Sequence, residues 1–225
     1  MHITYISIFP EIFQSFLETS LIKKAQEKWI LSFSLVNPRD FCLDKHKQID
    51  DEIYWWGAGM LMKAIPVIDA VEDTIKKWKK KFFVLYPTPT QQVFVQEFAH
   101  QMTEIDHLIF VCWRYEWIDY RFEQYMIDKY PNNFSKVSLG QFVVLWGELP
   151  AMVMSESIVR LIPGVIKEEA SWQDESYSIE HNMKNLEYPQ YTRPEEVYGY
   201  KIPEILISGH HKNIEKWRKE QSKKI

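Results

Sequence analysis

A cluster of polar side chains follows an apolar run near the middle of the chain. Residues 107–112 predict a buried strand, and Arg114, Tyr115, Glu116 and Asp119 come directly after it. Since ligands of open α/β sheets bind just beyond the carboxyl ends of the strands, this cluster is a candidate ligand-binding site. The alternative interpretation is a surface ion pair between Arg114 and Glu116 at a strand end.

Two other predicted strands also end in chemically unusual segments. Residues 86–91 read Tyr-Pro-Thr-Pro-Thr-Gln, and residues 145–150 read Leu-Trp-Gly-Glu-Leu-Pro. If these strands are neighbours of the strand at 107–112, the three loops converge on one pocket. Backbone groups of such loops could bind an adenosine-like ligand, and the periodicity does not say which one.

Familiar catalytic motifs are missing from the sequence. It contains no P-loop lysine motif, no Ser-His-Asp signature, no His-Glu-x-x-His and no Gly-x-Gly-x-x-Gly. The candidate pocket must therefore be interpreted from its loops.

The elements that would position these loops alternate along residues 1–160. This alternation predicts an α/β fold with a mostly parallel sheet and helices on both of its faces. The predicted strands are residues 3–9, 30–36, 82–86, 107–112 and 139–145. The predicted helices are residues 10–21, 61–80, 92–102, 118–126, 151–161 and 211–222. We expect a turn at 37–41, an exposed loop at 44–53, a polar insert at 131–137 and a linker at 165–192.

The amino-acid composition limits the number of domains and the cellular environment that we expect. The 225 residues are 46% hydrophobic and 26% charged, which predicts one large domain or one domain with a small second one. Cys42 and Cys112 suggest neither a disulfide scaffold nor a zinc site and fit a reducing cytosol. The first ten residues lack a basic segment and are too short to span a membrane, so we expect a cytoplasmic protein without a membrane anchor.

The net charge of −4 gives no overall basic signature, so a nucleic-acid partner would need a local patch. The strongest one lies on the predicted C-terminal helix, although a solvated helix face is the default interpretation. Its basic residues are Lys212, Lys216, Arg218, Lys219, Lys223 and Lys224.

Several sequence blocks together resemble the bacterial tRNA (guanine-N1-)-methyltransferases. The resemblance runs in register from Ile3 to about Ser222 and includes many independent motifs. They are Asn37-Pro38-Arg39-Asp40-Phe41, the run from Asp50 to Met62, Arg114-Tyr115-Glu116, the run from Gly147 to Met152, the run from Arg160 to Val165, the run from Tyr188 to Pro194, and Ser208-Gly209-His210-His211.

The resemblance implies a SPOUT-class methyltransferase with a deep trefoil knot that binds S-adenosylmethionine. These enzymes methylate N1 of the guanine just 3′ of the anticodon, position 37, and work as homodimers. We therefore expect a knotted cofactor domain at residues 1–163, a linker or mobile loop at 164–192, and a small helical domain at 193–225 that contacts the anticodon stem-loop of tRNA.

The resemblance also assigns site residues. Three segments match the loops that hold the cofactor, largely through backbone groups. The residues so assigned are Tyr86, Pro87, Thr88, Pro89, Trp113, Tyr115, Glu116, Leu139, Gly140, Phe142, Val144, Trp146 and Gly147.

Three further residues are assigned to catalysis. Arg160 matches the family's active-site arginine, which would offset charge on the guanine O6 as the N1 proton leaves. The segment Glu175-Ser176-Tyr177 aligns with the family's general base, and Asp174 comes just before it, so either carboxylate could accept that proton. A solvated acidic loop is the alternative. No metal-binding residue is assigned, and a need for magnesium stays open.

One departure from the family concerns tryptophan. Six tryptophans stand where the family has glycine: Trp29, Trp55, Trp56, Trp113, Trp117 and Trp146. The chain has 7 glycines, about half of the usual share of ~7%, and 9 tryptophans. Since some bacterial lineages read the UGA codon as glycine, our hypothesis is that these six are glycines in the native protein.

The alternative function is that of a degenerate homologue, which binds tRNA without catalysis because tryptophans block its cofactor pocket.

Overall fold

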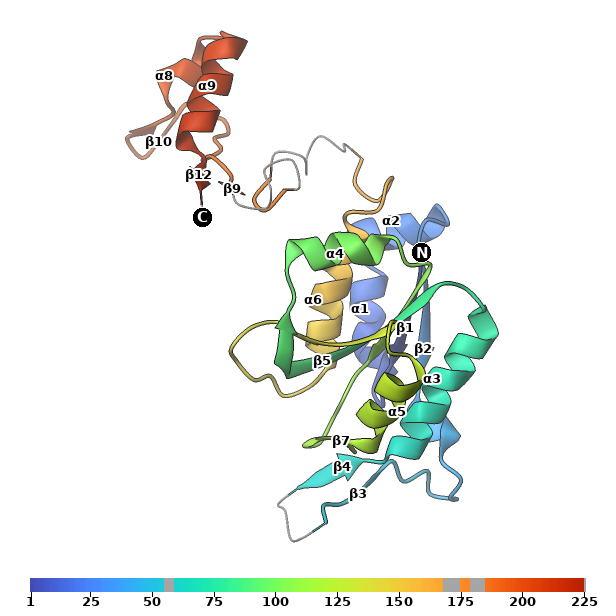
Figure 1. Cartoon of the computed structure of the whole chain (residues 1–225). Helices are drawn as coiled ribbons and strands as arrows, with labels where there is room; N and C mark the ends of the chain where they lie inside the picture. The colour runs from blue at the N-terminus through green and yellow to red at the C-terminus, as the bar shows by residue number, and fades with distance from the viewer. Residues whose placement is uncertain (55–58, 168–174, 179–184, 225) are drawn as a thin grey trace. The chain divides into compact units, whose positions relative to one another are not determined.

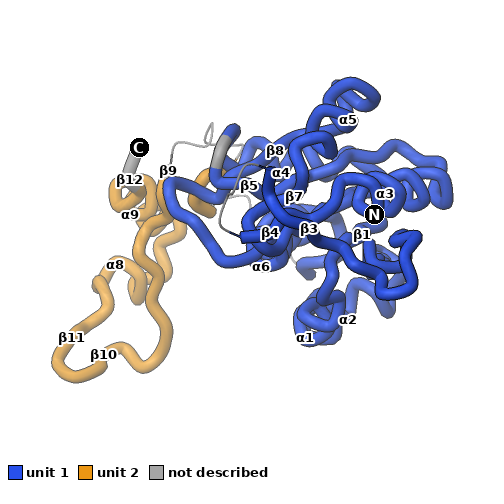
Figure 2. Tube along the Cα trace, turned by 90° about the horizontal axis from the view of Figure 1, so that it is seen from below, with its two compact units in different colours: residues 1–167 blue, residues 168–225 orange. Residues whose placement is uncertain are grey.

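A computed structural model describes residues 1–54, 59–167, 175–178 and 185–224. The chain forms two compact units, Met1–Lys167 and Glu168–Ile225, which are coloured separately in Figure 2. The finer division at 163 and 192 stays a prediction.

A five-stranded parallel sheet is the centre of the first unit. Its strands, in spatial order, are β2 (Ser32–Val36), β1 (His2–Ile6), β6 (His107–Val111), β5 (Phe82–Val93) and β8 (Phe134–Ser138). All four neighbouring pairs are parallel. The residues of β1 and β6 are buried throughout, as their apolar sequences predict. The predicted parallel α/β sheet is confirmed.

Helices cover both faces of this sheet (Figure 1). One core contains side chains of η1 (Pro10–Phe13), α1 (Gln14–Leu17), α2 (Ser20–Glu27), α4 (Gln96–Thr103) and α6 (Glu148–Val159). The other core contains side chains of α3 (Ala64–Trp78) and α5 (Arg121–Lys129). Successive strand residues alternate between the two cores, so that Tyr5 packs in the first and Ile6 in the second.

A smaller sheet adjoins the second face. It contains β3 (Asp50–Glu52), β4 (Met60–Met62) and β7 (Trp117–Ile118), in that order. The short 3-10 helix η2 (Pro38–Phe41) replaces the turn expected after β2, and the Asn37 side chain caps it by accepting a hydrogen bond from the Arg39 amide.

The second unit contains the predicted C-terminal helix. α9 (His211–Gln221) packs with α8 (Glu204–Ile207), and the rings of Tyr188 and Tyr191 lie near Trp217. The short pairs β10 (Glu196–Val197) with β11 (Tyr200–Lys201) and β9 (Asn185–Leu186) with β12 (Lys223–Lys224) complete it. Within the described part of the chain, no helix has the length and hydropathy needed to cross a membrane.

The position of the fifth strand was predicted wrongly. Residues 134–138 form β8, where a polar insert was expected, and residues 139–145 form a loop rather than a strand. The reason is burial: Val137 and Ser138 are buried against β5, whereas Phe142, Val143 and Leu145 are exposed although apolar. An apolar run alone does not distinguish a buried strand from an exposed apolar loop.

Other boundaries also differ from the predictions. Residues 60–62 form β4, and the helix expected at 61–80 begins at Ala64. β3 lies in the expected loop at 44–53. β5 continues to Val93 with an irregularity between Pro87 and Gln92, so the helix expected at 92–102 begins at Gln96. These segments were misassigned because strand pairing, which is not local, decides their state.

Trp29 has an unusual backbone conformation at the end of α2. The Trp29 amide donates to the Gln26 carbonyl and the Ile30 amide to the Ala25 carbonyl, which is the Schellman pattern of a helix end. The pattern places Trp29 at φ +61°, in the left-handed region that glycine usually occupies, and its side chain is 91% exposed. Glycine would meet this backbone requirement without losing any packing.

Two buried histidines lie side by side at the amino ends of β1 and β6. His2 pairs in register with His107, and the Thr4 hydroxyl lies 2.8 Å from Nε2 of His107. His2 also stacks on the Trp78 ring at 3.5 Å. Burial, His107, the N-terminal ammonium and Lys80 lower the pKa of His2 to about 3, and burial lowers the pKa of His107 to about 4.

These histidines predict that the protein loses stability in mild acid. Both are neutral in the folded protein and gain protons in the unfolded chain near the ordinary pKa of 6.5. The contribution of the two histidines to the free energy of unfolding is therefore complete above pH 6.5 and falls as the pH drops toward 4. At pH 5 the loss is up to about 2 kcal/mol for each histidine. Urea unfolding at pH 7 and pH 5 measures it. A His2→Gln/His107→Gln variant should lose less stability over the same interval, and an equal loss in both proteins would contradict the explanation.

Candidate ligand-binding site

The three unusual segments converge as predicted, because β6, β5 and β8 are neighbours in the sheet. Residues 86–91 lie within β5, where its pairing is irregular, and not in a loop after it. A small cavity, called the slot below, lies between this part of β5 and the segments that follow β6 and β8. The predicted residues that line it are Pro87, Thr88, Pro89, Trp113, Leu139, Phe142 and Val144, and the lining residues not predicted are Val137, Ser138 and Pro150. The sequence could not identify Val137 and Ser138, because their strand was taken for an insert.

The indole of Trp113 forms part of the wall of the slot. This side chain is buried, its indole Nε1 donates a 2.7 Å hydrogen bond to the Pro87 carbonyl, and its ring lies 4.2 Å from that of Trp117. The volume left is about 20 Å³, enough for roughly one water molecule. In this state the slot does not fit S-adenosylmethionine, since pockets for ligands of that size measure roughly 300–1,000 Å³.

Two glycines allow the chain to pass close to the slot. The Gly147 amide donates to the Trp113 carbonyl at 3.1 Å, and a Cβ at Gly147 would lie 2.7 Å from the Trp113 nitrogen. Gly140 has φ +148° and exchanges two hydrogen bonds with the Ser138 hydroxyl. The close approach at Gly147 holds the loop before α6 against the loop after β6.

A buried ion pair, which the sequence did not reveal, joins the same loops. Nε of Arg114 lies 3.0 Å from Oε1 of Glu148, and the Ser7 hydroxyl donates to this oxygen at 2.6 Å. The Glu148 side chain is fully buried, and the Arg114 guanidinium lies over the rings of Phe9 and Trp146. The surface pair between Arg114 and Glu116 considered above is therefore wrong, because the partner of Arg114 is Glu148.

Several predicted cofactor residues do not line the slot. The Tyr86 ring is buried in the core against Phe122. Tyr115 has φ +58°, and its hydroxyl accepts a 3.4 Å hydrogen bond from Arg39. The Glu116 amide donates to the Met60 carbonyl, and its side chain packs so closely on Gly59 that a Cβ there would collide with it. Trp146 lies beneath Arg114, at 3.9 Å.

Arg160, the predicted catalytic residue of the first unit, does not lie at the slot. Arg160 caps the carboxyl end of α6, whereas Gly147 precedes its first turn. Twelve helical residues separate these ends by about 18 Å, so Arg160 lies far from the slot of its own chain. Glu175 belongs to the second unit, where its carbonyl accepts from the Ser178 amide. Asp174 lies outside the described residues, as do Trp55 and Trp56.

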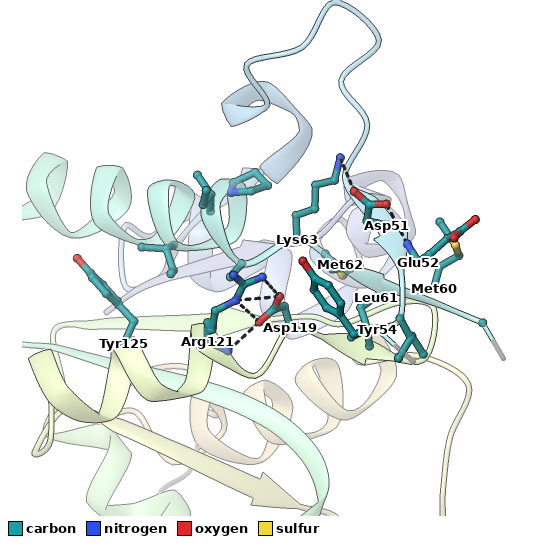
Figure 3. Close-up of a pocket in the computed structure, with 16 residues that line it drawn as sticks. Asp51, Glu52, Tyr54, Met60, Leu61, Met62, Lys63, Asp119, Arg121 and Tyr125 are labelled. Carbon is teal, nitrogen blue, oxygen red and sulfur yellow. Dashed lines mark hydrogen bonds and ion pairs between the residues drawn. The ribbon is translucent and has the colours of Figure 1, made fainter. Parts of the chain in front are cut away.

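A larger hollow of about 1240 Å³ lies beside the β3–β4 hairpin (Figure 3). Its lining includes the ion pairs Arg121–Asp119 and Lys63–Asp51, together with Tyr54. It is not the predicted site, since its walls come from the hairpin and the starts of α3 and α5 rather than from the ends of β5 and β8. The described side chains contain no group of three or more His, Cys, Asp or Glu residues arranged to hold a metal ion.

The fold and site define an α/β protein whose ligand loops lie at the carboxyl ends of neighbouring parallel strands. Sequence comparison identifies its class: the family described as tRNA (Guanine-1)-methyltransferase TrmD matches residues 1–225. A tRNA (guanine-N(1)-)-methyltransferase of Halalkalibacterium halodurans is 43% identical, covering 100% of this chain and 87% of the relative. The enzyme of that name from Bacillus subtilis is 40% identical, covering 99% of this chain and 87% of the relative.

The chain therefore belongs to the tRNA (guanine-1)-methyltransferase family, as its motifs predicted. Its relatives are named as enzymes that modify tRNA, which identifies this chain as a transferase of that family. The comparisons give no support to the alternative of a degenerate, non-catalytic homologue.

The buried ion pair predicts a large loss of stability when one partner is removed. Arg114→Met leaves the Glu148 carboxylate buried and unpaired, so the free energy of unfolding should fall by about 3 kcal/mol. Urea unfolding measures it. The matched control is Lys77→Met, which removes the exposed pair with Asp73 and should change stability by less than about 1 kcal/mol. Equal unfolding midpoints for Arg114→Met and the unchanged protein would contradict this role.

Proposed function

We propose that this protein transfers a methyl group from S-adenosylmethionine to N1 of the guanine just 3′ of the tRNA anticodon, position 37. The observation that carries the proposal is the family match over residues 1–225. The convergence of three loops at neighbouring strand ends supports it, because such loops can bind an adenosine through backbone groups.

The proposed cofactor site is the slot together with the loops around it. Pro87 presents a carbonyl there, and the backbone at Gly147 comes close to that of Trp113 because Gly147 has no side chain. S-adenosylmethionine supplies an electrophilic methyl group when bound. The Trp113 side chain must move before this ligand can enter, a requirement developed in the next subsection.

Two groups would act on the target base. The Arg160 guanidinium would stabilise negative charge on the guanine O6 as the N1 proton leaves, since it is charged at every relevant pH. Glu175 or Asp174 would accept that proton. Both roles rest on the family resemblance, and the structure adds a constraint: Arg160 stands at the end of α6 opposite the slot.

That constraint supports a homodimer with composite sites, in which Arg160 of one copy serves the slot of the other. The slot loop and the first turns of α6 expose Phe142, Val143, Leu145, Leu149 and Val153. A continuous set of exposed apolar side chains is typical of a protein interface. A second copy covering this surface would bring its own groups to the slot.

Further parts of the proposal follow from the family. The deep trefoil knot is proposed from the family resemblance. The residues around α9 would contact the anticodon stem-loop, and the exposed Lys212, Lys216 and Lys219 suit a phosphate backbone. We propose a cytoplasmic location, where tRNA is available.

Methyl transfer to an unmodified tRNA transcript tests the proposed function. With labelled S-adenosylmethionine, a transcript carrying guanine at position 37 should acquire one methyl group, recovered as 1-methylguanosine. The matched transcript with adenine at that position should acquire none. Omitting magnesium measures any need for that ion. Methylation of another base, or none under conditions where the cofactor is bound, would refute the proposal.

Mixed dimers test whether Arg160 acts across the interface. Arg160→Ala should leave a folded dimer that binds the cofactor and lacks detectable transfer. Gly147→Ala, in contrast, should damage the slot, because its Cβ meets the Trp113 backbone.

If Arg160 serves the partner's slot, a dimer of one Arg160→Ala and one Gly147→Ala subunit contains one intact site and should recover up to half of the activity. If Arg160 serves its own slot, neither site is intact. Absence of recovery in verified mixed dimers would therefore contradict the composite site.

A further inference from the structure

We infer that Trp113 is a plug in the cofactor slot, and that S-adenosylmethionine binds only after this indole has left. The inference rests on the proposed function, because it assigns the slot to that cofactor. It goes beyond it by naming the side chain that determines whether the slot is open.

The first step of the argument is volume. The slot walls come from β5, the end of β8, the segments after β6 and β8 and the first turn of α6, and the volume beside the indole is about 20 Å³. The Trp113 side chain is the largest of the lining groups, and it is 4% exposed. No ligand of nucleoside size can share this space with it.

The second step is the occupied acceptor. The indole Nε1 donates to the Pro87 carbonyl at 2.7 Å, so a slot carbonyl that could bind a ligand donor is used by the protein itself. The side chain thus takes both the space and a polar contact from an incoming adenosine.

The third step is that the Trp113 side chain can be removed without disturbing the backbone arrangement of the loops. The Gly147 amide donates a hydrogen bond to the carbonyl of residue 113, and the Arg114–Glu148 pair holds the same loop from the next residue. Neither contact uses the indole. A glycine at position 113 would therefore leave these backbone positions held while emptying the slot.

The inference predicts that Trp113→Gly binds S-adenosylmethionine at least tenfold more tightly than the unchanged protein. The reason is that in the unchanged protein the indole must first move out of the slot, which costs binding free energy. Calorimetric titration with S-adenosylmethionine and with S-adenosylhomocysteine measures it. The matched control is Trp29→Gly, the same substitution at an exposed helix end, which should leave both dissociation constants within twofold.

A second measurement needs no change to the plug. The Trp113 and Trp117 rings lie 4.2 Å apart and should give a coupled indole signal in near-ultraviolet circular dichroism. Trp117→Phe identifies the signal by removing it. Saturating cofactor should abolish the signal in the unchanged protein if the indole leaves the slot.

Equal affinities for the unchanged protein and Trp113→Gly, with the coupled signal intact at saturation, would overturn the plug while leaving the methyl-transfer proposal in place. Failure of every folded variant to bind either ligand would instead refute the assignment of the slot and, with it, the proposed cofactor.

Discussion

The buried ion pair between Arg114 and Glu148 is the interaction on which the arrangement of the site depends. It connects the loop after β6 with the first turn of α6, and the Ser7 hydroxyl attaches the end of β1 to the same carboxylate oxygen. A fully buried carboxylate is tolerated only when it is paired, so the three segments are held in one relative position. The ion pair thereby holds together segments next to the slot.

Two tryptophans stand at positions that would suit glycine. At Trp29 the backbone is left-handed and the indole is exposed, while at Trp113 the buried indole lines the slot in which the proposed cofactor would bind. Both positions would suit glycine for different physical reasons, one conformational and one steric. These observations are consistent with the hypothesis that the native residues are glycines, which stays a prediction for all six positions.

The sequence was a good guide wherever local pattern determines structure. The buried apolar runs predicted the strands β1 and β6, and the polar segment at 112–119 predicted the region of the site. The sequence-based prediction failed where contacts between residues far apart in the chain determine the structure. β8 was missed because the exposed Phe142, Val143 and Leu145 form a more apolar run than the strand itself. The partner of Arg114 lies 34 residues away, and no local pattern could select Glu148 over Glu116.

Hydrogen exchange of the backbone amides, with and without saturating S-adenosylmethionine, tests the central claim that three strand-end loops hold the methyl donor. The account predicts slower exchange on cofactor binding in residues 86–91, 112–117 and 138–147, with little change around the hollow at the β3–β4 hairpin. Protection confined to residues 51–54 and 59–66, which line that hollow, would contradict it and would place the ligand elsewhere.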